Sequence, residues 1–388
     1  VEVEGMAYVG GVGGKNAYAN WTYITVNVDE TSYVRANSIE DGKAYRTYVG
    51  GVCGFNGEGG HTFENIRSNI DVTGTTCDVG GLFGIAHYEN NFKNCSSSGD
   101  VIITDAEEAE EAEQIGGIAG VWHNETDHQV TFTNCSFTGT LSSNFTEGVD
   151  LNDNNIVGKA YGNGAGKLII DGSVCVCTSE QLVAALEKCQ DVLLRTNIKI
   201  DPANMSNAYG STGINVKNGQ TIDGGGHILD IKGAGGTWDS GINTTGGLIK
   251  NLTVTGSFRG IFINHNSTHS EKVVLENVTI DGTTYTISCD QGMNQGFEAT
   301  NSTFKGWTSY AATLGSAKFT DCSFGKGNGY AYCRPYAPTE FVGCTFEAGF
   351  KVDPVAAVTF ENCTIGGVAL TAENLSTLVT NTSNVTLR

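Results

Sequence analysis

Charged residues recur at similar intervals in the second half of this 388-residue chain, where they could line one surface. They occupy the short segments between copies of a repeated motif. Stacking these segments in order aligns five residues, namely His265, Asp290, Leu314, Arg334 and Asp353. Asp290 follows Cys289 as Arg334 follows Cys333, which supports this register, and neighbouring members would then lie about 5 Å apart. Acid–base chemistry is what such a row could perform, so His265, Asp290, Arg334 and Asp353 are the candidate catalytic residues.

Two features favour a simpler interpretation of this row. Leu314 interrupts it, and no two carboxylates become neighbours, although paired acid–base catalysis of glycoside cleavage requires two. A structural salt link between Arg334 and Asp353 is the alternative. The sequence therefore identifies no mechanism for these residues.

Aromatic residues gather in the same stretch and form a second candidate site. They are Trp307, Tyr310, Tyr330, Tyr332 and Tyr336. Exposed aromatic rings stack on sugar faces, and polar neighbours bind hydroxyl groups. These five residues are therefore candidate ligand-binding residues. The alternative is that alternate tyrosines pack inside the protein.

A repeated motif positions all of these residues. Its six copies centre on Asn251, Asn277, Asn301, Asp321, Gly343 and Asn362. The centres are 26, 24, 20, 22 and 19 residues apart, and self-similarity at such a period is typical of a solenoid. Apolar and polar residues alternate before each centre, as in a strand with one buried face. The centre itself favours a bend, because Asn tolerates turn conformations.

The same repeat explains most of the cysteines and many of the Asn-x-Ser/Thr triplets. One slot just after the centre is filled by Cys95, Cys135, Cys322, Cys344 and Cys363, and by Val278 in another copy. A slot that accepts both Cys and Val is small and apolar, which predicts buried thiols instead of disulfides. The triplets at Asn134, Asn251, Asn277 and Asn362 are predicted to be corners of the coil and not glycosylation sites.

The first part of the chain has a different, glycine-centred repeat. Its four copies begin at Val9-Gly10-Gly11, Val49-Gly50-Gly51, Val79-Gly80-Gly81 and Ile115-Gly116-Gly117. Paired glycines let backbones approach closely or bend at a corner. These copies resemble the GLUG motif of bacterial cell-surface proteins, including adhesin-like proteins and immunoglobulin-A-cleaving peptidases. The resemblance covers roughly residues 1–162 and implies a structural repeat of an exposed region.

Between the two repeat systems lies the clearest helix signal. Thr178 or Ser179 can cap a helix near residues 179–190, and its apolar face carries Leu182, Val183, Leu186 and Cys189. The segment Ile222-Asp223-Gly224-Gly225-Gly226 follows. A capping helix followed by this turn resembles the opening of pectate-lyase-like proteins, which implies a right-handed parallel β-helix. We therefore expect an all-β chain with a GLUG-like solenoid at 1–172 and a β-helix at 173–388.

Composition and charge limit the kinds of partner that this chain could bind. A net charge of −20 without a basic patch argues against nucleic acid, and no apolar run approaches a membrane span. The cysteines and histidines are not spaced like the ligands of a metal site. The acidic run 105–113 stays a weak candidate for binding calcium. Val1 to Gly11 already belongs to a repeat, so we expect a processed or truncated product, without its signal region.

The sequence favours a non-catalytic, secreted or cell-surface bacterial protein that acts in adhesion or in binding a glycan or host surface molecule. The His-Glu-x-x-His motif of zinc peptidases is missing from the sequence. Two alternatives remain open. One is a polysaccharide lyase or glycoside hydrolase with its site on the β-helix face, and the other is the non-catalytic stalk of a larger surface peptidase.

Overall fold

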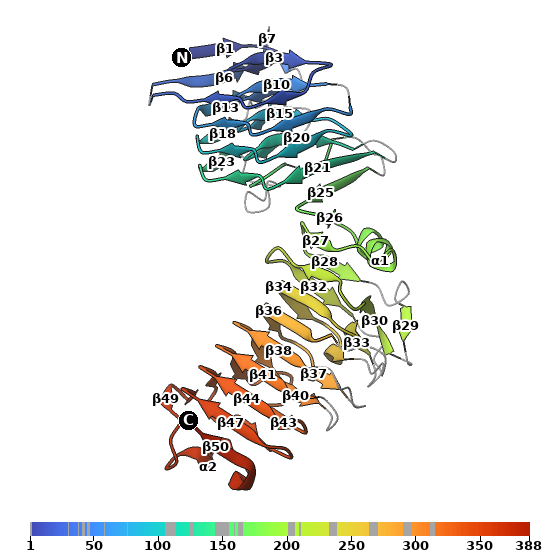
Figure 1. The fold of residues 1–388 in the computed structure, drawn as a ribbon, viewed down its shortest axis with the longest axis vertical. Coiled ribbons are helices and arrows are strands. Elements are labelled where there is room, and N and C mark those ends of the chain that lie inside the picture. The colour runs from blue at the N-terminus through green and yellow to red at the C-terminus, as the bar shows by residue number, and fades with distance from the viewer. Residues whose placement is uncertain are drawn as a thin grey trace. The chain divides into compact units, whose positions relative to one another are not determined.

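The chain forms two compact units, Val1–Cys175 and Val176–Arg388, here called unit 1 and unit 2. In the computed structural model the residues described are 2–29, 31–37, 39–40, 43–44, 47–57, 59–75, 77–104, 114–124, 128–143, 155–158, 160–161, 166–200, 206–208, 211–232, 239–263, 271–289, 296–310 and 315–388. Nearly all described elements are strands, and most pair in parallel, which confirms the all-β solenoid fold (Figure 1).

Unit 1 is a coil in which each full turn, or rung, contributes five short strands. Equivalent strands of successive rungs pair in parallel and form five rows. The first two rows are β1 (Glu2–Gly5), β6 (Tyr33–Asn37), β13 (Asp71–Thr75), β18 (Val101–Thr104) and β23 (Leu141–Ser143), then β2 (Tyr8–Gly10), β9 (Tyr48–Gly50), β14 (Asp78–Gly80) and β19 (Ile115–Gly116). The third row is β3 (Gly13–Asn16), β10 (Cys53–Asn56), β15 (Phe83–Ala86), β20 (Ala119–His123) and β24 (Ala160–Tyr161). The last two are β4 (Trp21–Thr22), β11 (Thr62–Glu64), β16 (Asn91–Lys93), β21 (Gln129–Thr133) and β25 (Lys167–Ile170), then β5 (Thr25–Val26), β12 (Arg67–Ser68), β17 (Ser96–Ser97) and β22 (Ser136–Phe137).

Two hairpins complete the strands of this region. They are β7 (Ile39–Glu40) with β8 (Lys43–Ala44), and β25 with the start of β26 (Ser173–Val176). The glycine pairs lie where rungs touch most closely. A Cβ atom on Gly51 would lie 2.4 Å from the Gly81 carbonyl oxygen of the next rung, so only glycine fits there.

Unit 2 is a coil with three strands in each rung. One row, called the outer row here, is β29 (Ser206–Ala208), β30 (Ser211–Val216), β33 (Ser240–Thr244), β35 (Arg259–Ile263), β37 (Tyr285–Cys289), β40 (Trp307–Tyr310), β43 (Tyr332–Pro335) and β46 (Lys351–Val352). The second contains β27 (Val192–Leu194), β31 (Thr221–Asp223), β34 (Gly247–Thr255), β36 (Val273–Ile280), β38 (Phe297–Thr300), β41 (Ala317–Thr320), β44 (Thr339–Val342), β47 (Val358–Glu361) and β50 (Val385–Leu387). The third contains β28 (Ile198–Ile200), β32 (Ile228–Ile231), β39 (Thr303–Lys305), β42 (Ser323–Gly325), β45 (Thr345–Phe346), β48 (Thr364–Ile365) and β49 (Val368–Ala369).

Helices occupy both ends of unit 2. Helix α1 (Ser179–Glu187) begins at Thr178, whose hydroxyl accepts a hydrogen bond from the Gln181 amide at 3.2 Å. The predicted helix is confirmed in place but ends at Glu187. Cys189 takes a left-handed φ of 58° and is exposed, so it does not lie on the buried face as predicted. At the other end are α2 (Leu375–Leu378) and the 3-10 turn η3 (Thr382–Asn384).

The centres of the repeated motif are corners, as predicted. Asn251, Asn277, Asn301, Asp321, Gly343 and Asn362 all have φ between 50° and 64°, the left-handed conformation that Gly and Asn tolerate best. Successive corners are joined through their side chains, since Asn277 Nδ2 donates to Asn251 Oδ1 at 3.0 Å. In unit 1, Asn134 Nδ2 donates to Asn94 Oδ1 at 2.8 Å in the same way.

The interior of each unit consists of columns of identical side chains. In unit 2, Phe319, Phe341 and Phe360 stack with ring centroids 5.1 Å apart at each step. In unit 1, Phe63, Phe92 and Phe132 stack at 5.0 and 4.7 Å. The rings are fully or almost fully buried, so each rung covers the apolar face of its neighbour. Stacked aromatic pairs add about 0.5–1.5 kcal/mol each beyond burial.

The repeated cysteine slot is also a column, and its five cysteines form no disulfide. Cys95, Cys322, Cys344 and Cys363 are buried, which confirms the prediction for them. Cys135 is only partly buried, since its rung is followed by the last strand of unit 1. Eight thiols of the chain are buried, whereas Cys177 and Cys189 are exposed.

We predict that Asn277→Ala destabilises unit 2 by about 1–2 kcal/mol, because Ala resists the left-handed conformation. Asn277→Gly loses the same side-chain hydrogen bond but keeps the backbone freedom, so it should cost less. Urea unfolding of both variants measures the difference. An alanine variant as stable as the glycine variant would contradict the role given to the corner.

Thiol labelling gives a second test of the fold. Ellman's reagent should react quickly with the exposed Cys177 and Cys189 of the native protein, and the Cys177→Ser/Cys189→Ser variant should lose this fast phase. Buried thiols should react only after unfolding, since burial raises the pKa of the Cys53 thiol to about 12 and disfavours the reactive thiolate. Fast labelling of the buried column in the native protein would refute the packing.

Candidate functional site

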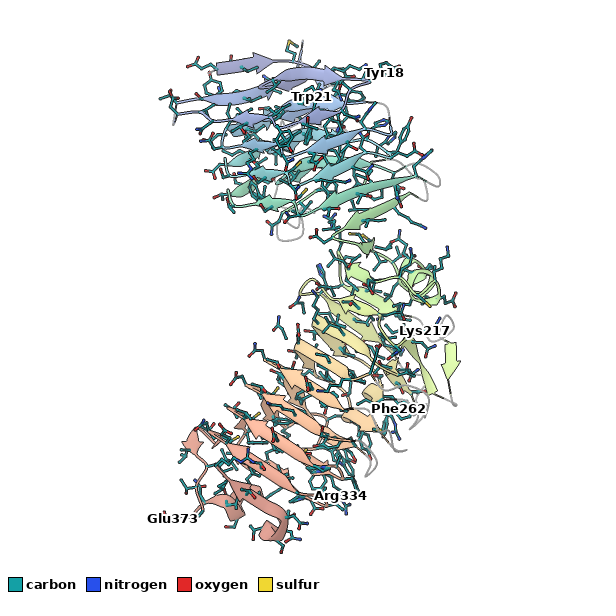
Figure 2. All side chains as sticks on the ribbon, in the orientation of Figure 1. Tyr18, Trp21, Lys217, Phe262, Arg334 and Glu373 are labelled. Atoms are coloured by element: carbon teal, nitrogen blue, oxygen red, sulfur yellow. The ribbon has the colours of Figure 1, made fainter. Side chains whose placement is uncertain are left out.

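The outer row of unit 2 positions the predicted site residues. Strand pairing places one residue of each of six strands in line along this row, namely Ser240, Arg259, Tyr285, Trp307, Tyr332 and Lys351. The next inward line contains Ile242, Ile261, Ile287, Thr308, Cys333 and Val352, all of them buried. Figure 2 shows Phe262 and Arg334 on this side of unit 2. The first line is therefore partly exposed from Tyr285 to Lys351, whereas its first two members, Ser240 and Arg259, are buried.

Four rings form what we call the aromatic column. Trp307 stacks on Tyr285 with centroids 4.8 Å apart and an interplanar angle of 21°. Tyr332 meets Trp307 edge-on at 5.3 Å, and Tyr330 lies tilted against it at 5.5 Å. The rings therefore cover one another's faces. Tyr330 is 42% exposed and is the most accessible ring of the column.

Cationic side chains flank the aromatic column. The guanidinium of Arg259 lies 5.2 Å from the Tyr285 ring centroid and 5.6 Å from that of Phe262. Arg259 is only 7% exposed and also donates to the Ser288 hydroxyl. The guanidinium of Arg334 lies 5.1 Å from the Tyr336 ring. Such cation–π contacts orient guanidinium groups along the row.

Asp353 connects this row to its neighbours. Its carboxylate accepts hydrogen bonds from the hydroxyls of Thr380 at 2.7 Å and Tyr332 at 2.6 Å, and lies 3.5 Å from Arg334 Nε. These hydrogen bonds, with a contribution from Arg334, lower the pKa of Asp353. Burial, followed by the bond to Asp353, raises the pKa of Tyr332. The site thus holds a carboxylate that stays ionised and a phenol that stays protonated.

The register differs from the predicted one. Cys333 pairs with Thr308 and, through it, with Ile287, so Arg334 lies in line with Ser309 and Ser288 and not with Leu314 and Asp290. An irregularity between Tyr285 and Ile287 shifts the pairing. The salt link between Arg334 and Asp353 is confirmed. His265, Asp290 and Leu314 lie outside the described residues, so their roles stay predictions.

One predicted ligand-binding residue is wrong. Tyr310 is fully buried, and its hydroxyl makes a hydrogen bond to Thr339 Oγ1 at 2.9 Å inside unit 2. It lies on the inward side because it is three residues beyond Trp307 in β40, and alternation reverses its direction. Trp307, Tyr332 and Tyr336 are partly exposed, and Tyr330 is exposed.

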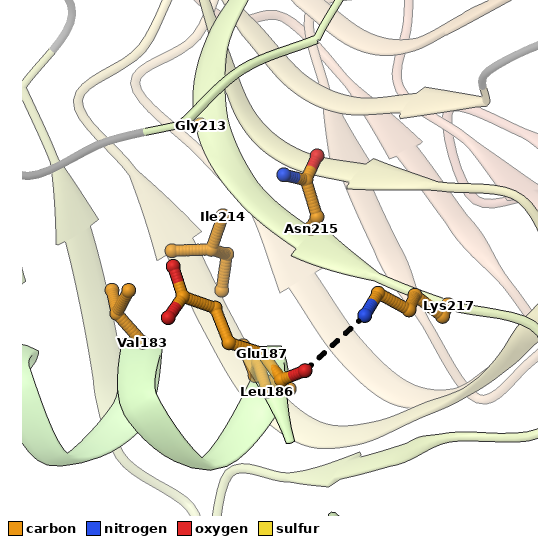
Figure 3. Close-up of a pocket in the computed structure, with 7 residues that line it drawn as sticks. All are labelled: Val183, Leu186, Glu187, Gly213, Ile214, Asn215 and Lys217. Carbon is orange, nitrogen blue, oxygen red and sulfur yellow. Dashed lines mark hydrogen bonds between the residues drawn. The ribbon is translucent and has the colours of Figure 1, made fainter. Parts of the chain in front are cut away.

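A small pocket of about 160 Å³ lies between α1 and β30. Val183, Leu186 and Ile214 supply its apolar lining, and Lys217 lies at one side, donating to the Glu187 carbonyl oxygen at 3.3 Å (Figure 3). The lysine thereby supplies a hydrogen-bond donor to a carbonyl oxygen at the carboxyl end of the helix. The pocket belongs to the packing of the end helix.

Sequence reasoning missed a histidine-rich corner in unit 1. Nitrogens of His87 and His123 lie 2.9 Å apart, and the Tyr88 ring contacts the rings of His87 at 4.2 Å and His128 at 4.8 Å. His87 directly follows β15 and His123 is the last residue of β20, and these two strands pair in register. The signal in the sequence was a histidine at the same position of two successive glycine-centred copies, three residues after Gly84 and three residues after Gly120.

Comparison with known proteins gives one match. Residues 173–314 match a family described as a pectate lyase-like adhesive domain. No curated protein and no solved structure matched the chain. The match supports a pectate-lyase-like fold for most of the predicted second domain and does not extend to the glycine-centred repeats.

The described residues contain neither a metal-ligand cluster nor a membrane-spanning helix. Within these ranges, no three His, Cys, Asp or Glu side chains are arranged to hold a metal ion. The acidic run 105–113, considered for calcium, lies outside them. No helix in the described ranges combines the length and apolar character needed to span a bilayer.

The histidine corner predicts a pH dependence. Burial, and then the neighbouring His123, lower the pKa of His87 to about 4. Between pH 6.5 and 4 the unfolded chain therefore binds a proton that the folded protein does not, and stability falls as the pH falls. Solvent screening at this partly buried site limits the expected loss to about 1–2 kcal/mol.

Urea unfolding at pH 7 and pH 4.5 measures this loss. His87→Gln should reduce the pH dependence, because Gln does not titrate. His61→Gln is the matched control and should retain it. Equal pH dependence in the wild type and His87→Gln would exclude His87 as the source.

Proposed function

We propose that the protein is a secreted or cell-surface adhesion module that binds a glycan or host surface molecule through the aromatic column of unit 2. The column is the observation that carries this proposal. It presents one accessible tyrosine ring, ring edges and the partly exposed guanidinium group of Arg334 on a single face. Tyrosine, tryptophan and arginine are the residues that contribute most to binding energy at protein surfaces.

The matched family agrees with this proposal, since its description names an adhesive domain with a pectate-lyase-like fold. In this proposal the GLUG-like repeats of unit 1 act as a structural part of the same surface protein. Extended concave or flat faces of solenoids are common binding surfaces. A cell-surface location also follows from the proposed role.

Binding is favoured over catalysis by the state of the charged residues. Asp353 is held by Tyr332, Thr380 and Arg334, and its pKa is lowered. A general base works best when its pKa lies near the working pH. A carboxylate stabilised in its ionised form is therefore better suited to orienting Arg334 and Tyr332 than to removing a proton.

The Tyr330→Ala variant tests the proposal. A glycan array probed with the full chain should give hits, and this variant should bind them about tenfold more weakly, because it removes the most exposed ring. Tyr18→Ala is the matched control, since Tyr18 is 79% exposed in unit 1. No hits across host and plant glycans, or equal binding by Tyr330→Ala, would contradict the proposed site.

A further inference from the structure

Unit 1 contains a polar hollow beside its histidine-rich corner. Its volume is about 280 Å³, and its lining is Glu89, Asn91, His128 and Gln129. We call it the Glu89 hollow. It lies where β15 leads into β16 and where the next rung enters β21. Its residues therefore come from two neighbouring rungs, held together by strand pairing.

The hollow has a fixed arrangement of hydrogen-bonding groups. Glu89 Oε1 lies 2.6 Å from His128 Nδ1, and the His128 ring stacks on Tyr88 at an angle of 30°. With Nδ1 donating to the carboxylate, a neutral His128 has Nε2 as an acceptor. The side-chain amides of Asn91 and Gln129 add donors and acceptors. Such convergent polar groups are what recognise hydroxyl groups in binding sites.

The backbone at Glu89 gives a second, independent observation. Glu89 adopts a left-handed φ of 58°, which disfavours a residue with a long side chain. The preceding rung makes its turn at this corner with glycines, including Gly60 at φ 84°. The Glu89 amide donates to the Gln129 carbonyl oxygen at 2.7 Å, which fixes the turn. Unlike the asparagine corners, this position holds a long acidic side chain in a conformation that it does not favour, which makes it a candidate for function.

We propose that the Glu89 hollow binds one ring of a neutral sugar. A carboxylate, an imidazole and two amides can pair with several hydroxyl groups at once. The carboxylate disfavours uronic acids and other anionic ligands, in a chain that already carries a net charge of −20. The volume is just below the roughly 300–1,000 Å³ of pockets for larger ligands, which suits a single ring.

This site is separate from the aromatic column, because all of its residues belong to unit 1. The two proposals can therefore fail independently. Variants at Glu89 and His128 test the hollow, and variants at Tyr330 test the column. Tyr330→Ala serves as the background protein for the experiment below, so that the column does not contribute.

The experiment is saturation-transfer difference NMR of the full chain with lactose, cellobiose, N,N′-diacetylchitobiose and digalacturonate. We expect a signal from at least one neutral disaccharide and none from digalacturonate. Glu89→Gly should reduce that signal at least fivefold. His128→Phe should do the same, since it keeps the ring against Tyr88 but removes both nitrogens. Glu64→Gln, which changes a carboxylate on β11 outside the hollow, should leave the signal unchanged.

Thermal unfolding separates a binding role from a structural one. Glu89→Gly removes the backbone strain, so its melting temperature should stay the same or rise by about 2–4 °C. Lost sugar binding in a variant of equal or greater stability supports the proposal. The absence of any neutral-sugar signal, a signal from digalacturonate alone, or unchanged binding by Glu89→Gly and His128→Phe would overturn it.

Discussion

The whole structure depends on parallel stacking in register of one rung on the next. A rung cannot bury its apolar face alone, so its neighbours must cover it. The left-handed corner makes this possible, because it bends each chain segment at the same residue. Asn251 and Asn277 join successive corners through their amides at 3.0 Å. A corner that moved by one residue would turn every following side chain to the opposite face.

The same register that builds the core also builds the surfaces. In the interior, the register stacks identical side chains on one another, as in the column of Phe319, Phe341 and Phe360. Outside, it aligns Tyr285, Trp307 and Tyr332. Stacking on the surface has a cost for recognition, since rings that cover each other cannot both stack on a sugar. Tyr330 comes from a loop and not from the row of strands, and it is the most exposed of the four rings.

The sequence predicts those features that follow the period. Corners such as Asn277 and buried thiols such as Cys344 could be predicted, because identical positions recur in every copy. The helix at Ser179 could be predicted from its cap and apolar spacing. The outer row is harder, because the intervening segments differ in length and the pairing shifts between Tyr285 and Ile287. The match of Cys289 with Cys333 that sets the predicted register is two residues from the observed pairing of Ile287 with Cys333 through Thr308, and Tyr310 faces inward because alternation within β40 reverses its direction.

The histidine corner shows a second limit of sequence reasoning. His87, Glu89 and His128 are unevenly spaced in the sequence, and the pairing of β15 with β20 and of β16 with β21 brings them together. Neither their types nor their spacing forms a motif. Contacts of this kind depend on which rung lies next to which, so they become visible only with the three-dimensional register.

The central claim is that the register of the outer row creates the surface that contacts ligand. Its most direct test is the fluorescence of Trp307, measured in a chain whose other three tryptophans are replaced by phenylalanine and titrated with a glycan identified on the array. We expect a saturable change in Trp307 emission, with a midpoint equal to the independently measured Kd. Binding at full occupancy without any change in Trp307 emission would contradict it.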